Sequence, residues 1–220
     1  MAILSGGPNS GFSGKAGSVV GYYRMGKWVI RGLPRLSPKN RKGSAMQNIY
    51  RSRFTAIQDF LQPIIAVIRV GFNLEAKQKG NTAHNSAKSW NMLHAFEENG
   101  ELDYSKTRIS SGLLTGAEDA AANFKDGKII FTWRDNSEGI ASRILLPRRS
   151  DQVLVLAYDI STKQTIYRLS GARRSTCSET LDVLEELRPG IDKWHTWIAF
   201  IADDRNSVSN SKYLGLVVAK

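Results

Sequence analysis

The strand that decides the fold is expected at residues 193–202, which read KWHTWIAFIA. Side chains alternate between the two faces of a strand. One face then carries Trp194, Thr196, Ile198 and Phe200, and the other carries His195, Trp197, Ala199 and Ile201. Because both faces are largely apolar, we predict a central strand whose second side is covered by helices or by another subunit.

Further short strands are predicted around this one. A period near two continues through residues 100–220, interrupted by turn clusters such as 135–139 and 188–190. The other candidate strands span 102–109, 128–133, 141–146, 152–158, 165–169, 179–184 and 207–218. About seven short strands over roughly 100 residues are typical of an antiparallel β-sandwich. We therefore predict a β-sandwich domain over residues 100–220.

A helical segment is predicted over residues 44–99. Ser44 and Gln47 have the three-residue spacing of a capping box. Apolar residues then recur with the 3.6-residue period of one buried stripe, namely Met46, Ile49, Tyr50, Phe54, Ile57, Phe60, Leu61, Ile64, Ile65, Ile68 and Phe72. Pro63 is expected to kink or divide this helix, and a second helix is expected from Ala83 to near Asn99.

Residues 1–43 differ in composition and predict a basic, glycine-rich arm. Ten Lys and Arg precede Asp59, the first acidic residue, so nearly all of the formal net charge of +11 lies at this end. Nine of the 19 glycines fall at or before Gly43, and together with the prolines they exclude a long helix. The composition therefore fits an arm better than a core.

Within the arm, residues 18–24 and 27–31 predict a β-hairpin, because Met25-Gly26 separates them at two-residue turn spacing. The first strand would place Val19, Gly21 and Tyr23 on one face and Val20, Tyr22 and Arg24 on the other. A lone hairpin is marginal in water, so this one needs a surface to lie on. The candidate contact residues are Tyr22, Tyr23, Arg24, Lys27, Trp28, Val29, Ile30 and Arg31, followed by a basic linker with Arg35, Lys39, Arg41 and Lys42.

Composition also excludes several classes of protein. The single cysteine, Cys177, allows no intramolecular disulfide and supplies too few thiolates for a usual structural zinc site. The longest apolar run, residues 60–72, is interrupted by Gln62, Pro63 and Arg69, so no membrane span is expected. Residues 1–17 lack the pattern of a signal peptide. We therefore expect synthesis in the cytoplasm without classical secretion, and a place in a particle or virion is compatible with this.

The residue types needed for catalysis are sparse. Gly14-Lys15 resembles the end of a phosphate-binding loop, but Ala16 stands where Ser or Thr would bind Mg²⁺, and Asn9 stands where the first glycine belongs. The three histidines are His84, His94 and His195, and their spacing and surroundings favour packed or surface positions. We expect no enzymatic activity, no cofactor and no metal.

Several runs resemble one known family. They are residues 13–21 (SGKAGSVVG), 51–54 (RSRF), 60–63 (FLQP), 103–106 (DYSK), 131–137 (FTWRDNS) and 207–211 (SVSNS). In this order they are similar to a family common in Bacteroidota that is catalogued only as a domain of unknown function. The resemblance spans nearly the whole chain and implies a C-terminal half similar to an immunoglobulin or fibronectin type III sandwich. It implies no activity and no catalytic residues.

One segment departs from that family's pattern. Residues 38–44 read PKNRKGS, where the family usually has an Asn-Pro-Arg-Thr-like run before the first helix, although Ser44 keeps the capping role. A looser resemblance links the basic glycine-rich opening and the terminal sandwich to prophage-encoded structural proteins.

The sequence thus predicts an α+β fold, with an arm at 1–43, a helical segment at 44–99 and a sandwich at 100–220. We expect a non-enzymatic structural protein that self-assembles or docks into a larger assembly, such as a phage-like particle or a filament. Its arm would contact copies of the chain or other structural subunits. The alternative is a nucleic-acid-binding protein whose arm neutralises phosphates and stacks aromatic side chains on bases. A third hypothesis, recognition of a glycan by the sandwich loops, rests on fold analogy.

Overall fold

The computed structural model describes residues 2–4, 11–33, 43–137, 147–183 and 193–218. The chain divides into two compact units, Met1–Asn48 and Ile49–Lys220. The boundary between them falls in the first turns of helix α1 (Ala45–Leu61). Each unit is described separately.

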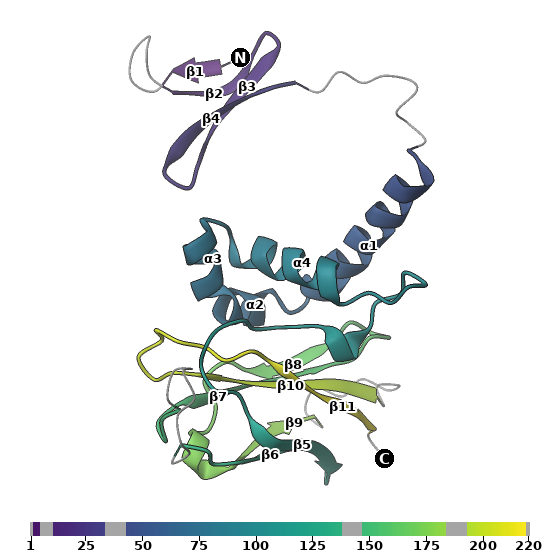
Figure 1. Ribbon diagram of the computed structural model, residues 1–220, viewed down its shortest axis with the longest axis vertical. Coiled ribbons are helices and arrows are strands. Elements are labelled where there is room, and N and C mark those ends of the chain that lie inside the picture. Colours follow the sequence, from purple (N-terminus) through teal and green to yellow (C-terminus); the bar gives the residue numbers. More distant parts are fainter. Residues whose placement is uncertain (1, 5–10, 34–42, 138–146, 184–192, 219–220) are drawn as a thin grey trace. The chain divides into compact units, whose positions relative to one another are not determined.

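The N-terminal unit contains one antiparallel sheet of four strands (Figure 1). In spatial order these are β1 (Ala2–Leu4), β2 (Phe12–Ala16), β3 (Val19–Arg24) and β4 (Lys27–Gly32). Met25 and Gly26 have φ angles of 48° and 79° and form the β3–β4 turn, as a two-residue turn of type I′ requires. The predicted hairpin is therefore confirmed. Two further strands, which the glycine-rich sequence did not indicate, extend it into a sheet.

The larger unit has three layers (Figure 1). One sheet has the order β5-β6-β9 and contains Glu118–Lys125, Lys128–Arg134 and Ser178–Asp182. The central sheet has the order β11-β10-β7-β8 and contains Lys212–Val218, Lys193–Ile201, Gln152–Tyr158 and Thr165–Arg168. Helices form the third layer. All pairings between these strands are antiparallel, and the predicted α+β class is confirmed. The immunoglobulin or fibronectin type III likeness remains a prediction.

The helical layer consists of α1, α2 (Ile65–Gly71), α3 (Asn73–Lys79) and α4 (Ala83–His94). The predicted capping box is present, because Ser44 Oγ accepts from the Gln47 backbone N–H at 3.3 Å and Gln47 Oε1 accepts from that of Ser44 at 3.0 Å. The chain turns by 92° between α1 and α2, close to Pro63. Among the described residues no single helix is long and apolar enough to span a membrane, although α1 and α2 together reach that length and composition.

Strand β10 contributes to two separate hydrophobic cores, as its alternation predicted. Trp194, Ile198 and Phe200 pack between the two sheets with residues of β6, β7 and β9. Trp197 and Ala199 pack on the opposite side against the helices, together with residues from β7. The helices are therefore the cover of the second side. All five side chains are completely buried.

The predicted stripe of α1 is buried only from Ile57 onward. The four large apolar residues that precede it are exposed, namely Met46, Ile49, Tyr50 and Phe54. Periodicity identifies the apolar side of a helix but not how far along that side its neighbours reach. The prediction of one continuous buried stripe was therefore wrong for the first turns.

Three strand predictions need correction or lie outside the described residues. Residues 102–109 form a bridge at Leu102 and a 3₁₀ helix at Tyr104–Lys106 in place of a strand. The last strand begins only at Lys212, after isolated bridges at Val208 and Ser209. The candidate at 141–146 lies outside the described part of the chain.

Strand β5 was missed because its inward positions are Ala120, Ala122 and Phe124, a weak apolar pattern.

Asp103 caps this 3₁₀ helix and predicts a pH dependence of stability. Hydrogen bonds from Lys106 and Ser105 lower the pKa of Asp103 to about 2, from 3.8. A carboxyl whose pKa is depressed by folding stabilises the fold above pH 4 and loses that contribution as the pH falls toward 2. Asp103→Asn is expected to lower the free energy of unfolding by about 1 kcal/mol at neutral pH, since Lys106 is half exposed. Urea titrations at pH 7 and pH 2.5 should show this difference becoming much smaller in acid; a difference of unchanged size would contradict the assignment.

Candidate functional site

The register of the N-terminal sheet sorts its side chains onto two faces. Residues directly opposite each other in antiparallel strands share a face. Lys15 lies opposite Val20, which lies opposite Arg31, while Tyr22 pairs with Val29 and Arg24 with Lys27. We call this set the basic face: Ile3, Ser13, Lys15, Val20, Tyr22, Arg24, Lys27, Val29 and Arg31. The other set, the aromatic face, comprises Phe12, Gly14, Ala16, Val19, Gly21, Tyr23, Trp28, Ile30 and Gly32.

Large side chains on the aromatic face are open to solvent. The exposed fractions are 59% for Tyr23, 42% for Trp28 and 59% for Ile30. The rings of Tyr23 and Trp28 meet edge to face with 5.2 Å between their centroids. This face contains no charged side chain.

Two glycines allow the aromatic rings to lie against the backbone. A Cβ atom at position 21 would stand 2.4 Å from the backbone oxygen of Phe12 and 2.8 Å from its ring. A Cβ atom at position 11 would stand 1.9 Å from the Trp28 indole. Both distances are far below the roughly 3.5–4.0 Å at which carbon atoms make contact. Glycine at these two positions therefore lets the rings pack closely against the backbone.

The basic face concentrates positive charge without compensation inside its own unit. Residues 1–48 contain no Asp and no Glu, so no carboxylate side chain of this unit can pair with Lys15, Arg24, Lys27 or Arg31. Arg24 and Lys27 stand directly opposite each other, and like charges in such a position destabilise a strand pair. An arrangement that raises the local potential in this way attracts anions.

The structure separates the predicted contact residues into two groups. Tyr22, Arg24, Lys27, Val29 and Arg31 lie on the basic face, whereas Tyr23, Trp28 and Ile30 lie on the aromatic face. Sequence reasoning missed Phe12 and Lys15, whose strand is obscured by Gly11, Gly14 and Gly17. The basic linker residues Arg35, Lys39, Arg41 and Lys42 lie outside the described part of the chain.

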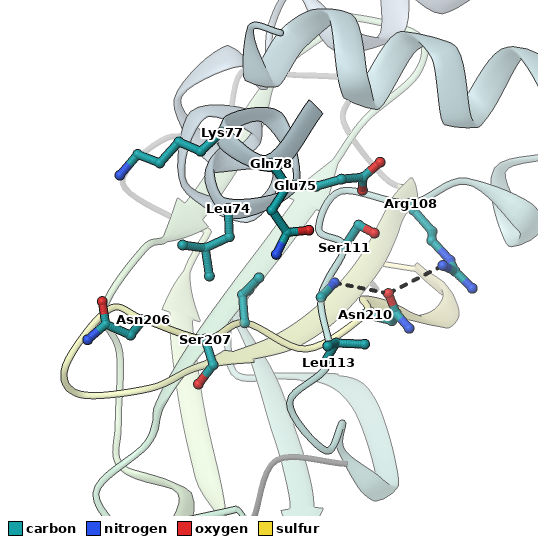
Figure 2. A pocket seen from close by; sticks show the side chains of 12 residues that line it. Leu74, Glu75, Lys77, Gln78, Arg108, Ser111, Leu113, Asn206, Ser207 and Asn210 are labelled. Carbon is teal, nitrogen blue, oxygen red and sulfur yellow. Dashed lines mark hydrogen bonds between the residues drawn. The ribbon is translucent and has the colours of Figure 1, made fainter. Parts of the chain in front are cut away.

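The larger unit has a pocket of about 530 Å³ between α3 and the segments 108–113 and 206–210 (Figure 2). Asn210 Oδ1 accepts hydrogen bonds from the Gly112 backbone N–H at 3.2 Å and from Arg108 at 3.3 Å. The Arg108 guanidinium also lies over the Trp90 ring at 4.2 Å. Burial alone would raise the pKa of Glu75, but the ion pair with Lys79, a hydrogen bond with Ser111 and the charge of Arg108 together outweigh burial and lower that pKa. The charged side chains Glu75 and Arg108 are thus partnered within the protein itself.

Two of the three histidines, His94 and His195, are packed against aromatic rings. His195 Nδ1 lies 2.7 Å from the Tyr213 hydroxyl, and the Tyr104 ring lies 4.9 Å from the imidazole. Burial lowers the pKa of His195, although the negative charge of Asp159 acts to raise it. His94 stacks on Trp90 with 4.4 Å between centroids. Within the described ranges, no three His, Cys, Asp or Glu side chains cluster so as to hold a metal ion.

Fold and surfaces together define an α+β protein in which an antiparallel sheet with two different faces comes first in the chain. The three-layer unit Ile49–Lys220 follows it, and we call this unit the body. The model of a family of unknown function, DUF6266, matches residues 11–215, and the chain belongs to that family. No curated protein and no solved structure matches the chain. The resemblance drawn from the sequence is confirmed as membership of a family of unknown function, while its occurrence in Bacteroidota and its prophage link remain predictions.

Proposed function

We propose that the chain is a non-enzymatic structural protein that self-assembles, or docks onto other structural subunits, through the aromatic face of its N-terminal sheet. The observation that carries the proposal is the exposure of Tyr23, Trp28 and Ile30 on one uncharged face. A sheet with an apolar face is stable when that face packs against another layer.

Exposed apolar side chains gather at this end of the chain. Nine of the 15 large apolar side chains that the described residues leave exposed lie before Asp59, namely Ile3, Tyr23, Met25, Trp28, Ile30, Met46, Ile49, Tyr50 and Phe54. Soluble proteins rarely leave large contiguous apolar patches uncovered unless they are sites of interaction. Both the aromatic face and the first turns of α1 supply such surface.

The free energy that this contact can contribute indicates assembly through several weak interfaces per subunit. Burial of three fully exposed large side chains would contribute roughly 4.5–9 kcal/mol, at 1.5–3 kcal/mol each, and the contact contributes about half of that because these side chains are already partly covered. Association removes an estimated 4–15 kcal/mol of translational and rotational freedom. One aromatic face alone therefore gives weak binding, and stable assembly requires several contacts per subunit. A contact between two different patches would propagate into a ring or filament, whereas a self-complementary contact would stop at a dimer.

The proposal predicts that association depends on the aromatic face. Ile30→Ser combined with Tyr23→Ser should reduce the mass in light scattering to that of the monomer, 24.4 kDa. Both substitutions leave the contact between Trp28 and Gly11 in place. Deleting residues 1–43 should have the same effect.

The matched control is Lys27→Ser combined with Arg31→Ser, on the same sheet but on the basic face. It should leave the mass of the assembly unchanged. Amide exchange of β3 and β4 would verify that each variant keeps its sheet. If the unchanged protein is monomeric at every concentration, or if the aromatic-face variant assembles as the unchanged protein does, the proposal is wrong.

A further inference from the structure

We infer that the basic face of the N-terminal sheet is a separate binding site for the phosphate backbone of single-stranded nucleic acid. This site goes beyond the proposed assembly function and uses the opposite face of the sheet. The register carries the inference, because it brings every described Lys and Arg of the N-terminal unit onto one side: Lys15, Arg24, Lys27 and Arg31.

These cations surround an apolar centre. Arg24 and Lys27 form the row next to the turn, Tyr22 and Val29 form the next row, and Lys15 and Arg31 flank Val20 in the row after that. Lys15 and Arg31 are two strand spacings apart, or about 10 Å, and four residues along β3 span about 13 Å. A single strand crossing this area would meet cations on both sides of Tyr22.

The electrostatic environment favours a polyanion over a single anion. Four positive charges lie within this area, and residues 1–48 supply no carboxylate side chain. Phosphates of a nucleic acid strand form a regular row of charges, and their neutralisation releases counterions. The unfavourable pairing of Arg24 with Lys27 becomes favourable once a phosphate lies between them.

Tyr22 favours nucleic acid over an acidic protein surface. It lies at the centre of the basic face and, like its neighbours Val20 and Val29, is partly exposed. Open sheets that present aromatic rings among cations stack unpaired bases, and such stacking tolerates any base sequence. A purely acidic partner would pair with the cations but would make no use of the ring.

The test measures binding of the full chain to a fluorescent oligothymidylate by anisotropy, over a series of salt concentrations. Each phosphate contact on a single strand contributes about −0.7 to the slope of log affinity against log salt concentration. Four contacts therefore predict a slope of about −3. Lys27→Gln combined with Arg31→Gln should reduce that slope by about 1.4 and weaken binding about tenfold or more at low salt. Lys193→Gln combined with Lys212→Gln removes the same charge from exposed positions of the body, and should leave both quantities nearly unchanged.

The adjacent tyrosines supply a second matched pair. Tyr22→Leu, on the basic face, should weaken binding by about 5- to 150-fold without changing the slope, as expected for loss of one stacked base. Tyr23→Leu, on the aromatic face, should bind as the unchanged protein does. Ile30→Ser should also retain binding even where it abolishes assembly, so failure of this inference and failure of the proposed function are distinguishable.

Three results would overturn the inference. One is absence of binding at low salt. Another is an equal loss of affinity for the body and basic-face charge variants, which would indicate general electrostatic attraction. The third is equally strong binding of polyglutamate or of anionic lipid vesicles together with no effect of Tyr22→Leu, which would indicate an acidic protein or a membrane as the partner.

Discussion

Replacing Arg174 with methionine is expected to lower the free energy of unfolding of the body by about 3–5 kcal/mol. Arg174 and Asp151 have no exposed side-chain surface, and their charged groups lie 3.3 Å apart. Arg174 also donates to Asn136 Oδ1 at 2.6 Å and to the Thr115 backbone oxygen at 2.9 Å. Its guanidinium lies 3.8 Å from the centre of the Phe200 ring. Methionine would fill much of the volume but leave Asp151 buried without its partner.

An exposed ion pair provides the matched comparison. Lys163 and Asp59 lie 3.1 Å apart, with 54% and 56% of their side chains exposed. Lys163→Met should therefore change the free energy of unfolding by less than about 1 kcal/mol. Urea denaturation followed by tryptophan fluorescence measures both variants. Similar, small effects of the two substitutions would show that Arg174 does not hold the segments around it together.

Replacing Trp197 with alanine is expected to lower the free energy of unfolding by about 3–5 kcal/mol. Trp197 is completely buried between the central sheet and the helices. Its ring centroid lies 5.8 Å from that of Phe60 in α1 and 5.3 Å from that of Tyr213 in β11. Removal of the indole would leave a cavity between two layers whose backbones cannot collapse onto it.

Trp197→Phe is the control for this substitution. The indole Nε1 has no hydrogen-bond partner among the described residues, so phenylalanine removes a buried, unsatisfied donor together with some volume. We expect its effect to stay within about 1.5 kcal/mol. Thermal and urea denaturation would test both variants. If alanine and phenylalanine were equally tolerated, the packing of helices on this sheet would not depend on Trp197.

The parts of the fold that could be predicted from sequence are those with strong local signals. Alternation in residues 193–202 predicted the two faces of β10, and Met25-Gly26 predicted the turn between β3 and β4. Ser44 and Gln47 predicted the start of α1. In each case the residues that determine the structure are close together in the chain.

Features that depend on distant pairing could not be predicted. Asp151 and Arg174 are 23 positions apart, and nothing in their neighbourhoods indicates that they meet in the core. The basic face needs the β2–β3 register as well as the alternation in β3, because only that register adds Lys15 to the set. The exposure of Tyr50 and Phe54 likewise depends on where the neighbouring elements end.

The two four-stranded sheets of this chain differ in what a mutation to them would change. The centre of the sheet containing β10 packs against another layer on both sides, so substitutions of its buried residues act on folding. The N-terminal sheet presents side chains on both of its sides, so under the two proposals substitutions at Tyr22 or Tyr23 would change binding and leave the fold of residues 49–220 intact. The two proposals therefore place binding and folding on different sheets, so that a change of partner at β3 and β4 would require no change in the cores formed around β10.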